Sequence, residues 1–125
     1  MPTFAPSTVL RFVEGVQPSF IRVLFDAGTS ANTSSSADFT PSRGYFKPGV
    51  LIAYADVEVE GSVYAFVKGV QVKLFDVPEG VRREIDVGAV FGDVLAEKIV
   101  LVGTTKVVTS DVRRVVLFYC GGLYG

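Results

Sequence analysis

Short runs in which apolar and polar residues alternate recur along this chain, and they are rich in valine. Val81–Val87 and Ser19–Asp26 both alternate in this way, which is the pattern of a strand with one buried face. Twenty-three of the 125 residues are valine, and β-branched side chains favour strands over helices. The chain is therefore expected to be all-β, with at most one short helix.

Glycine, proline and serine separate these runs at intervals of about 8–12 residues, as in sandwiches and barrels. The predicted strands are Thr8–Val13, Ser19–Asp26, Val50–Glu60, Val63–Lys68, Val70–Phe75, Val81–Val87, Ile99–Val102, Lys106–Thr109 and Val112–Tyr119. This pattern predicts an antiparallel β-sandwich that is jelly-roll-like, and a closed β-barrel is the alternative. The length suits a single domain, residues 1–125.

Two segments depart from the strand pattern. Residues 27–49 hold three glycines, two prolines and a cluster of serine and threonine, so a long Ser/Thr/Gly-rich loop is expected there. A connection of that length is uncommon in a compact domain and is usually functional. Residues 121–125, with three glycines, are expected to form a flexible tail.

Gly61 and Ser62 predict a hairpin turn between the strands Val50–Glu60 and Val63–Lys68, but the register stays open. A two-residue loop would place valines of the first strand on one face with the aromatic residues of the second. A three-residue loop with a glycine bulge would pair the small residues in the core and place the acidic ones outside. The second register is favoured because it keeps the acids off the apolar face.

Three carboxylates, Asp56, Glu58 and Glu60, would lie on one face of that strand, roughly 6–7 Å apart at the usual strand rise. Such a row could bind a hard cation such as Ca²⁺ or serve glycoside hydrolysis. A solvated outer face is the simpler interpretation, because alternation alone produces this spacing.

The sequence contains no histidine. Serine and cysteine nucleophiles with an imidazole base, and histidine metal sites, are thereby excluded. Cys120 is the single cysteine, and it is interpreted as a small buried hydrophobe rather than a nucleophile. We therefore expect no enzyme, no catalytic residue, no metal and no cofactor.

The apolar content is high for a short chain, at 49% with a mean hydropathy of +0.42. The surplus must lie in lipid, in a ligand pocket or in a subunit interface, because a small domain cannot bury it all. No apolar run reaches the roughly 18 residues that a membrane helix needs, and no signal peptide is visible. We expect a soluble protein, cytoplasmic or particle-associated, whose partner is a second copy of itself.

The charges give no sign of another partner. Twelve basic and thirteen acidic residues are interspersed, for a net charge of −1. A protein that binds duplex nucleic acid usually carries a basic excess, so that partner is not expected.

Two groups of residues are candidate contact sites. Arg43, Tyr45, Phe46 and Lys47 combine charge and aromatic surface in the predicted loop, where they could bind a ligand or fold onto their own domain. The aromatic C-terminal end could form a subunit interface or dock on the same chain. Its candidate residues are Phe118, Tyr119, Leu123 and Tyr124.

Three functions remain. The first is a non-catalytic, homo-oligomeric structural protein, for example a virion or surface component of a thermophile. The thermophilic source is suggested by scarce Asn and Gln. The second is a small module that binds a glycan, a peptide or a single-stranded nucleic acid through residues 27–49. The third, a carboxylate-dependent carbohydrate enzyme, has only the acidic row in its favour.

Overall fold

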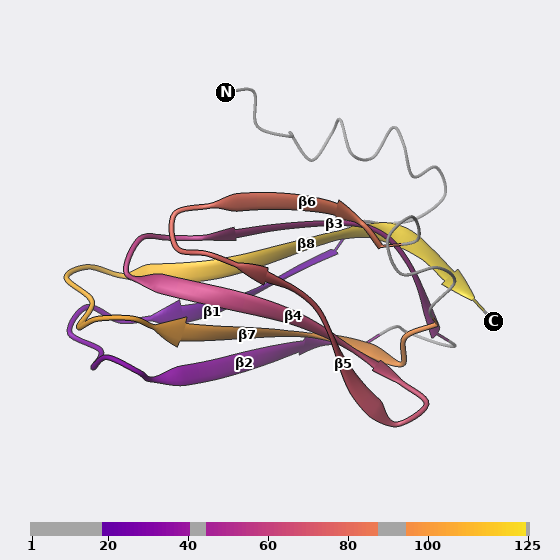
Figure 1. Ribbon diagram of the computed structural model, residues 1–125, viewed down its shortest axis with the longest axis horizontal. Helices are drawn as coiled ribbons and strands as arrows, with labels where there is room; N and C mark the ends of the chain where they lie inside the picture. Colours follow the sequence, from indigo (N-terminus) through magenta and orange to yellow (C-terminus); the bar gives the residue numbers. More distant parts are fainter. Residues whose placement is uncertain (1–18, 41–44, 88–94, 125) are drawn as a thin grey trace.

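The computed structural model describes residues 19–40, 45–87 and 95–124, and in them the chain forms eight strands (Figure 1). The strands are β1 (Ser19–Phe25), β2 (Ser34–Phe39), β3 (Tyr45–Ala55), β4 (Val59–Val67), β5 (Val70–Val77), β6 (Arg82–Asp86), β7 (Lys98–Thr105) and β8 (Arg113–Tyr124). They form two antiparallel four-stranded sheets that pack face to face. The prediction of an antiparallel β-sandwich is confirmed, and the alternative of a closed barrel is wrong for these strands.

The strand order is β1-β8-β3-β6 in the first sheet, sheet A, and β2-β7-β4-β5 in the second, sheet B. Every strand pairs with its counterpart from the other end of the series: β1 with β8, β2 with β7, β3 with β6 and β4 with β5. The chain is thus one long antiparallel ribbon that turns at β4–β5. The β3–β8 and β4–β7 pairings close this ribbon into two sheets.

The core lies between the sheets and is filled by alternate residues of each strand. Leu51, Ile99, Leu101 and Leu117 are fully buried there. At one end of this layer an aromatic group joins both sheets: the Phe46 and Tyr119 rings lie 4.9 Å apart, and each also contacts Phe39 of β2.

The predicted turn at Gly61 is wrong, and so are both registers that depended on it. The chain turns at Asp56–Glu58, where the backbone N–H of Val59 donates to the carbonyl of Asp56. Glu58 has a φ of 72°, a left-handed conformation that is uncommon outside glycine. This turn carries the chain from sheet A to sheet B, so β3 and β4 are not a hairpin.

Gly61 instead lies inside β4 with its Cα facing the other sheet, directly opposite Gly103 of β7. A Cβ atom at Gly61 would lie 2.5 Å from Cγ1 of Val115 on β8. At Gly103 the nearest atom would be Cε2 of Phe25, at 3.1 Å. The glycine pair therefore lets the sheets approach closely at this point, which is a role of glycine in strands besides turns.

The segment predicted as one loop over residues 27–49 contains β2 and the start of β3. Ser34–Phe39 is a strand because every residue of it pairs with β7. Residues 121–124, predicted as a tail, extend β8, whose end pairs with Tyr45–Lys47. Lys106–Thr109 is not a strand but part of the β7–β8 connection. The predicted strand Thr8–Val13 lies outside the described residues.

Candidate functional site: the outer face of sheet A and the loop end

The outer face of sheet A is formed by alternate residues of its strands. In sheet A the odd-numbered residues of β1, of β8 up to Tyr119 and of β3 after its register shift at Lys47–Val50 fill the core, so the even-numbered ones there lie on the outside. Cross-strand pairing sets them in rows, one of which runs Arg22, Val116, Tyr54, Arg82 from β1 to β6. The next row includes Phe118, Ile52 and Glu84.

The middle of this face is apolar. Val50, Ile52 and Phe118 pack together as a cluster separate from the main core, and Ile52 is only 9% exposed. Val116 and Tyr54 continue the cluster towards the turn at Asp56–Glu58. We call these five residues of β3 and β8 the apolar stripe. An outer face of this kind differs from the solvated one that an antiparallel sheet commonly has.

Charged side chains flank the apolar stripe. Arg22 on β1 and Arg114 on β8 are exposed on one side. Glu84 and Asp86 are exposed on β6, on the other side. Arg114 also lies 3.8 Å from the carboxylate of Asp56. Arg82 lies beside Glu84 on the same face of β6, so that edge carries charges of both signs and the middle of the face is apolar.

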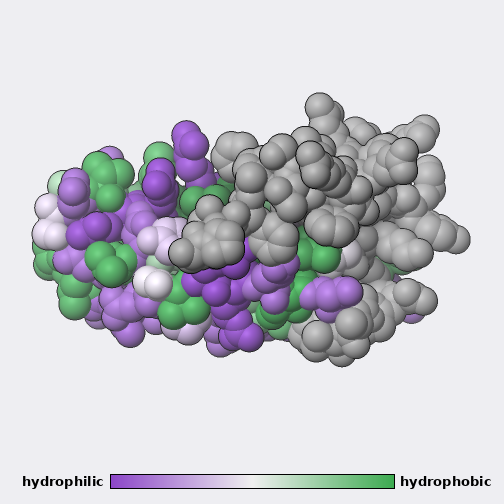
Figure 2. All heavy atoms as spheres, turned by 90° about the horizontal axis from the view of Figure 1, so that it is seen from above, coloured by the Kyte–Doolittle hydropathy of each residue, from purple (hydrophilic) through white to green (hydrophobic). Residues whose placement is uncertain are grey.

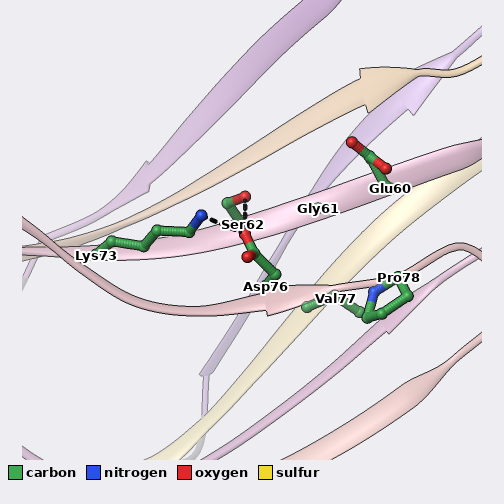
Figure 3. A pocket seen from close by; sticks show the side chains of 7 residues that line it. All are labelled: Glu60, Gly61, Ser62, Lys73, Asp76, Val77 and Pro78. Atoms are coloured by element: carbon green, nitrogen blue, oxygen red, sulfur yellow. Dashed lines mark hydrogen bonds and ion pairs between the residues drawn. The ribbon is translucent and has the colours of Figure 1, made fainter.

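The outer face of sheet B also has apolar residues in its middle, where Tyr64 of β4 pairs with Val100 of β7, and its edge strands carry polar side chains. A groove of about 370 Å³ lies on β4 and β5. Its lining residues, drawn in Figure 3, are Glu60, Gly61, Ser62, Lys73, Asp76, Val77 and Pro78. Within it, Asp76 accepts a hydrogen bond from Ser62 Oγ at 2.8 Å and lies 2.7 Å from Lys73 Nζ. The hydrogen bond from Lys73 lowers the pKa of Asp76, and the same contact raises that of Lys73. Ser62, Lys73 and Asp76 are therefore hydrogen-bonding and ionic partners of one another.

A second apolar surface lies where four connections meet, at the left of Figure 1. The connections are residues 26–33, 56–58, 78–81 and 106–112, and together we call them the loop end. Val57, Val107, Val108 and Val112 are each about half exposed there, between 49% and 60%, and Val81 is 40% exposed. Figure 2 shows hydrophobic residues among hydrophilic ones at this end of the molecule.

Two buried threonines hold the loop end in place. Thr105 Oγ1 donates to the carbonyl of Ser30 at 2.6 Å and accepts from the N–H of Thr33 at 2.9 Å. Thr109 Oγ1 donates to the carbonyl of Asp26 at 2.7 Å and accepts from the N–H of Thr29. Because both hydroxyls bond to backbone groups of the β1–β2 connection, that connection is tied to the end of β7 and to the β7–β8 connection.

The predicted row of carboxylates does not form on one strand face. Asp56 and Glu58 lie in the β3–β4 turn, and only Glu60 lies on β4. The carboxylate of Glu58 accepts from the N–H of Ser110 at 3.0 Å and from Nε of Arg113 at 2.9 Å. These two bonds, in that order, lower the pKa of Glu58. A carboxyl held ionised in this way is unsuited to act as a general acid near neutral pH.

The positions of the aromatic candidates do not match the hypothesis of a binding loop. Phe46 is 1% exposed and belongs to the core, so its ring is not available to a ligand. Tyr45 and Lys47 lie beside it in β3, where their backbones pair with Tyr124 and Gly122. Arg43 lies outside the described residues.

The four candidate interface residues do not lie on one surface. Tyr119 faces the core and is 2% exposed, whereas Phe118 lies on the outer face of sheet A. Leu123 and Tyr124 extend β8, and their backbones pair with Phe46 and Tyr45. Phe118 is thus the candidate that joins the apolar stripe.

The apolar stripe was not predicted, although the sequence carries a signal for it. Val50–Ala55 and Val115–Cys120 are continuous apolar runs rather than alternating ones. Such runs are typical of strands that are covered on both faces. Among the described residues no group of three His, Cys, Asp or Glu could hold a metal ion, and no helix is suited to cross a bilayer.

Comparison of the sequence with models of protein families and with curated proteins gave no match.

Proposed function

We propose that this chain is a non-catalytic structural subunit that assembles with copies of itself. The observation that carries the proposal is the set of exposed apolar side chains at the loop end, together with the partly buried apolar stripe as a second apolar surface. A subunit of an extended assembly contacts more than one neighbour, and two separate surfaces suit that requirement. A monomer has no comparable need for apolar patches.

The strand order supports a jelly roll. In that fold eight strands form two sheets through Greek-key connections, and here the chain winds as one antiparallel ribbon with β8 beside β1. Jelly rolls occur in viral capsids and in lectins. A virion or surface component of a thermophile is the setting we propose, since the chain has one Asn and two Gln and its ion pairs include Arg113–Glu58 and Lys98–Asp38.

The two alternatives have less support. A binding module on residues 27–49 would use the Phe46 ring, which lies in the core. A carbohydrate enzyme would use a pair of carboxylates of different pKa. Asp56 and Glu58 form ion pairs with Arg114 and Arg113, so both carboxylates have a structural role within the fold.

Light scattering coupled to size-exclusion chromatography tests the proposal on the purified full chain over a wide range of concentrations. The expected mass is a multiple of 13.4 kDa that grows with concentration if the assembly is reversible. Electron microscopy of the largest fraction then distinguishes a closed particle from a filament. A monomer at the highest attainable concentration refutes the proposal.

A further inference from the structure

We propose that β2, an edge strand of sheet B, pairs with β2 of a second copy, so that sheet B continues from one copy into the other. The two strands run antiparallel about a two-fold axis that passes between the two Ser36 residues. The inference rests on the proposed function and deepens it, because it names a contact between copies and its register.

β2 is a strand that the rest of the fold covers little. Among the described residues it pairs only with β7, and it lies at the rim of sheet B (Figure 1). Ser34, Ser35 and Ser36 are all exposed, although successive residues of a strand point to opposite faces. Neither face of this half of the strand is therefore buried. Serine is also not among the residues that favour strands, so β2 depends on backbone pairing.

Half of the backbone polar groups of β2 point away from β7. The N–H of Thr105 donates to the carbonyl of Thr33 at 2.9 Å, so the backbone groups of Thr33 face β7. In an antiparallel pair the residues alternate in the side to which their N–H and C=O point. The backbone groups of Ser34, Ser36 and Asp38 therefore face the free edge, where they can pair with another strand.

The edge strands at the opposite ends of the two sheets are protected against such pairing. Charged side chains and bulges are two of the devices that protect an edge. β5 pairs with β4 through a register shift between Val63 and Tyr64. β6 has four charged residues among its five, namely Arg82, Arg83, Glu84 and Asp86. β2, by contrast, has a single charged residue, Asp38, and pairs with β7 without a register shift.

β1, the edge strand of sheet A that contacts β2, is less suited to pair with itself. Its middle residue is Arg22, and an antiparallel pairing centred there would place two arginines opposite each other, which is unfavourable. The Arg22 side chain lies on the outer face of sheet A, away from sheet B, and is exposed. It can therefore extend into solvent in both copies when β2 pairs.

The side chains of β2 complement those of a second β2, which identifies the partner as another copy. With Ser36 opposite Ser36, Ser34 of each copy lies opposite Asp38 of the other. The Ser34 hydroxyl can accept from Thr104 Oγ1, at 3.0 Å, and donate to that carboxylate. Asp38 contacts Lys98 Nζ through Oδ2, so Oδ1 is directed to the new contact. The two Asp38 residues are offset by four residues along the strands, about 14 Å, and do not repel at close range.

Substitutions of opposite sign at Ser34 test this register on the full chain. Ser34→Asp places a carboxylate opposite Asp38 twice in the dimer and should weaken association about tenfold. Ser34→Lys places an ammonium group there and should tighten association at least about threefold. Sedimentation velocity measures both, and circular dichroism checks that each variant is folded. Gln71→Asp and Gln71→Lys, at an exposed position of the edge strand β5, are matched controls that should change nothing.

Ser36→Pro tests the backbone pairing. Proline removes the N–H that faces the free edge and leaves the bonds to β7, so the fold should persist while this contact is lost. If the wild-type protein is a monomer, the proposed function fails together with the inference. If the wild type associates but Ser36→Pro does not weaken it, or the two Ser34 variants have the same effect, the function stands and this contact is wrong.

Discussion

Replacement of Gly61 by alanine probes the closest approach of the two sheets. The added Cβ would lie 2.5 Å from Cγ1 of Val115, which is about 1 Å inside ordinary carbon contact. Neither atom is at the end of a flexible side chain, so the strands must separate locally or the valine must leave its rotamer. The variant should therefore be less stable than the wild type.

The magnitude follows from two opposing contributions. Overpacking of a core by one methyl group costs about 1–3 kcal/mol. Replacement of a glycine in a strand interior stabilises the folded state by roughly 0.5–1 kcal/mol, because glycine loses more conformational entropy on folding. The overlap at 2.5 Å is deep, so the upper half of the overpacking range applies. The expected net loss in the free energy of unfolding is then about 1–2.5 kcal/mol, or a fall of about 3–10 °C in melting temperature for a domain of this size.

Urea unfolding followed by circular dichroism, at one protein concentration because the chain is expected to associate, measures the change. Gly103→Ala is the matched control, and a smaller loss is expected because its nearest contact, the Phe25 ring, is 3.1 Å away. Val115→Ala combined with Gly61→Ala should lose less than the sum of the two single variants, since the overlapping methyl is gone. A Gly61→Ala protein as stable as the wild type would refute the close approach.

Two further predictions concern polar groups of the loop end. Thr105→Val leaves the N–H of Thr33 without its acceptor and should cost about 1–3 kcal/mol in urea unfolding, whereas Thr104→Val, at a hydroxyl on the surface, should cost under about 0.5 kcal/mol. Because the folded state lowers the pKa of Glu58 below its ordinary 4.5, the stability that this carboxylate contributes is fully present above that value and is lost as pH falls through the folded pKa. The stability difference between the wild type and Glu58→Gln should therefore shrink from about pH 7 to about pH 3, and a constant difference would contradict the role of the Arg113 contact.

The sequence predicted the fold class and several strands because alternation is a local signal. Val81–Val87 contains β6, and Ser19–Asp26 contains β1 with one extra residue. These strands bury one face and expose the other, so their period of two appears directly in the sequence.

Other elements depend on partners that are distant in the chain. The serine-rich β2 is a strand because β7 pairs with it, 60–70 residues away, and most of its residues have no strong strand preference of their own. Phe46 is buried by Phe39 and Tyr119, so its aromatic side chain indicated a binding loop only while those neighbours were unknown.

Glycine is ambiguous in a single sequence, and this explains the misplaced turn. Gly61 could allow a turn or a close approach of two strands, and both uses fit a glycine between apolar runs. The actual turn lies at Asp56–Glu58, where Glu58 takes a positive φ without being glycine. The N–H of Glu58 donates to the carboxylate of Glu79, a contact that only the folded chain supplies.

The winding of the ribbon also determines the order in which the protein can be built. The inner strand β8 lies between β1 and β3, and the inner strand β7 lies between β2 and β4. Both emerge from the ribosome after the other six described strands. Until then β1 and β2 have none of their sheet partners, so neither sheet can close during synthesis. Folding must therefore begin largely after β8 is released, and its high share of distant contacts makes it slow. During that interval the apolar runs of β3 and β4 are exposed to other chains.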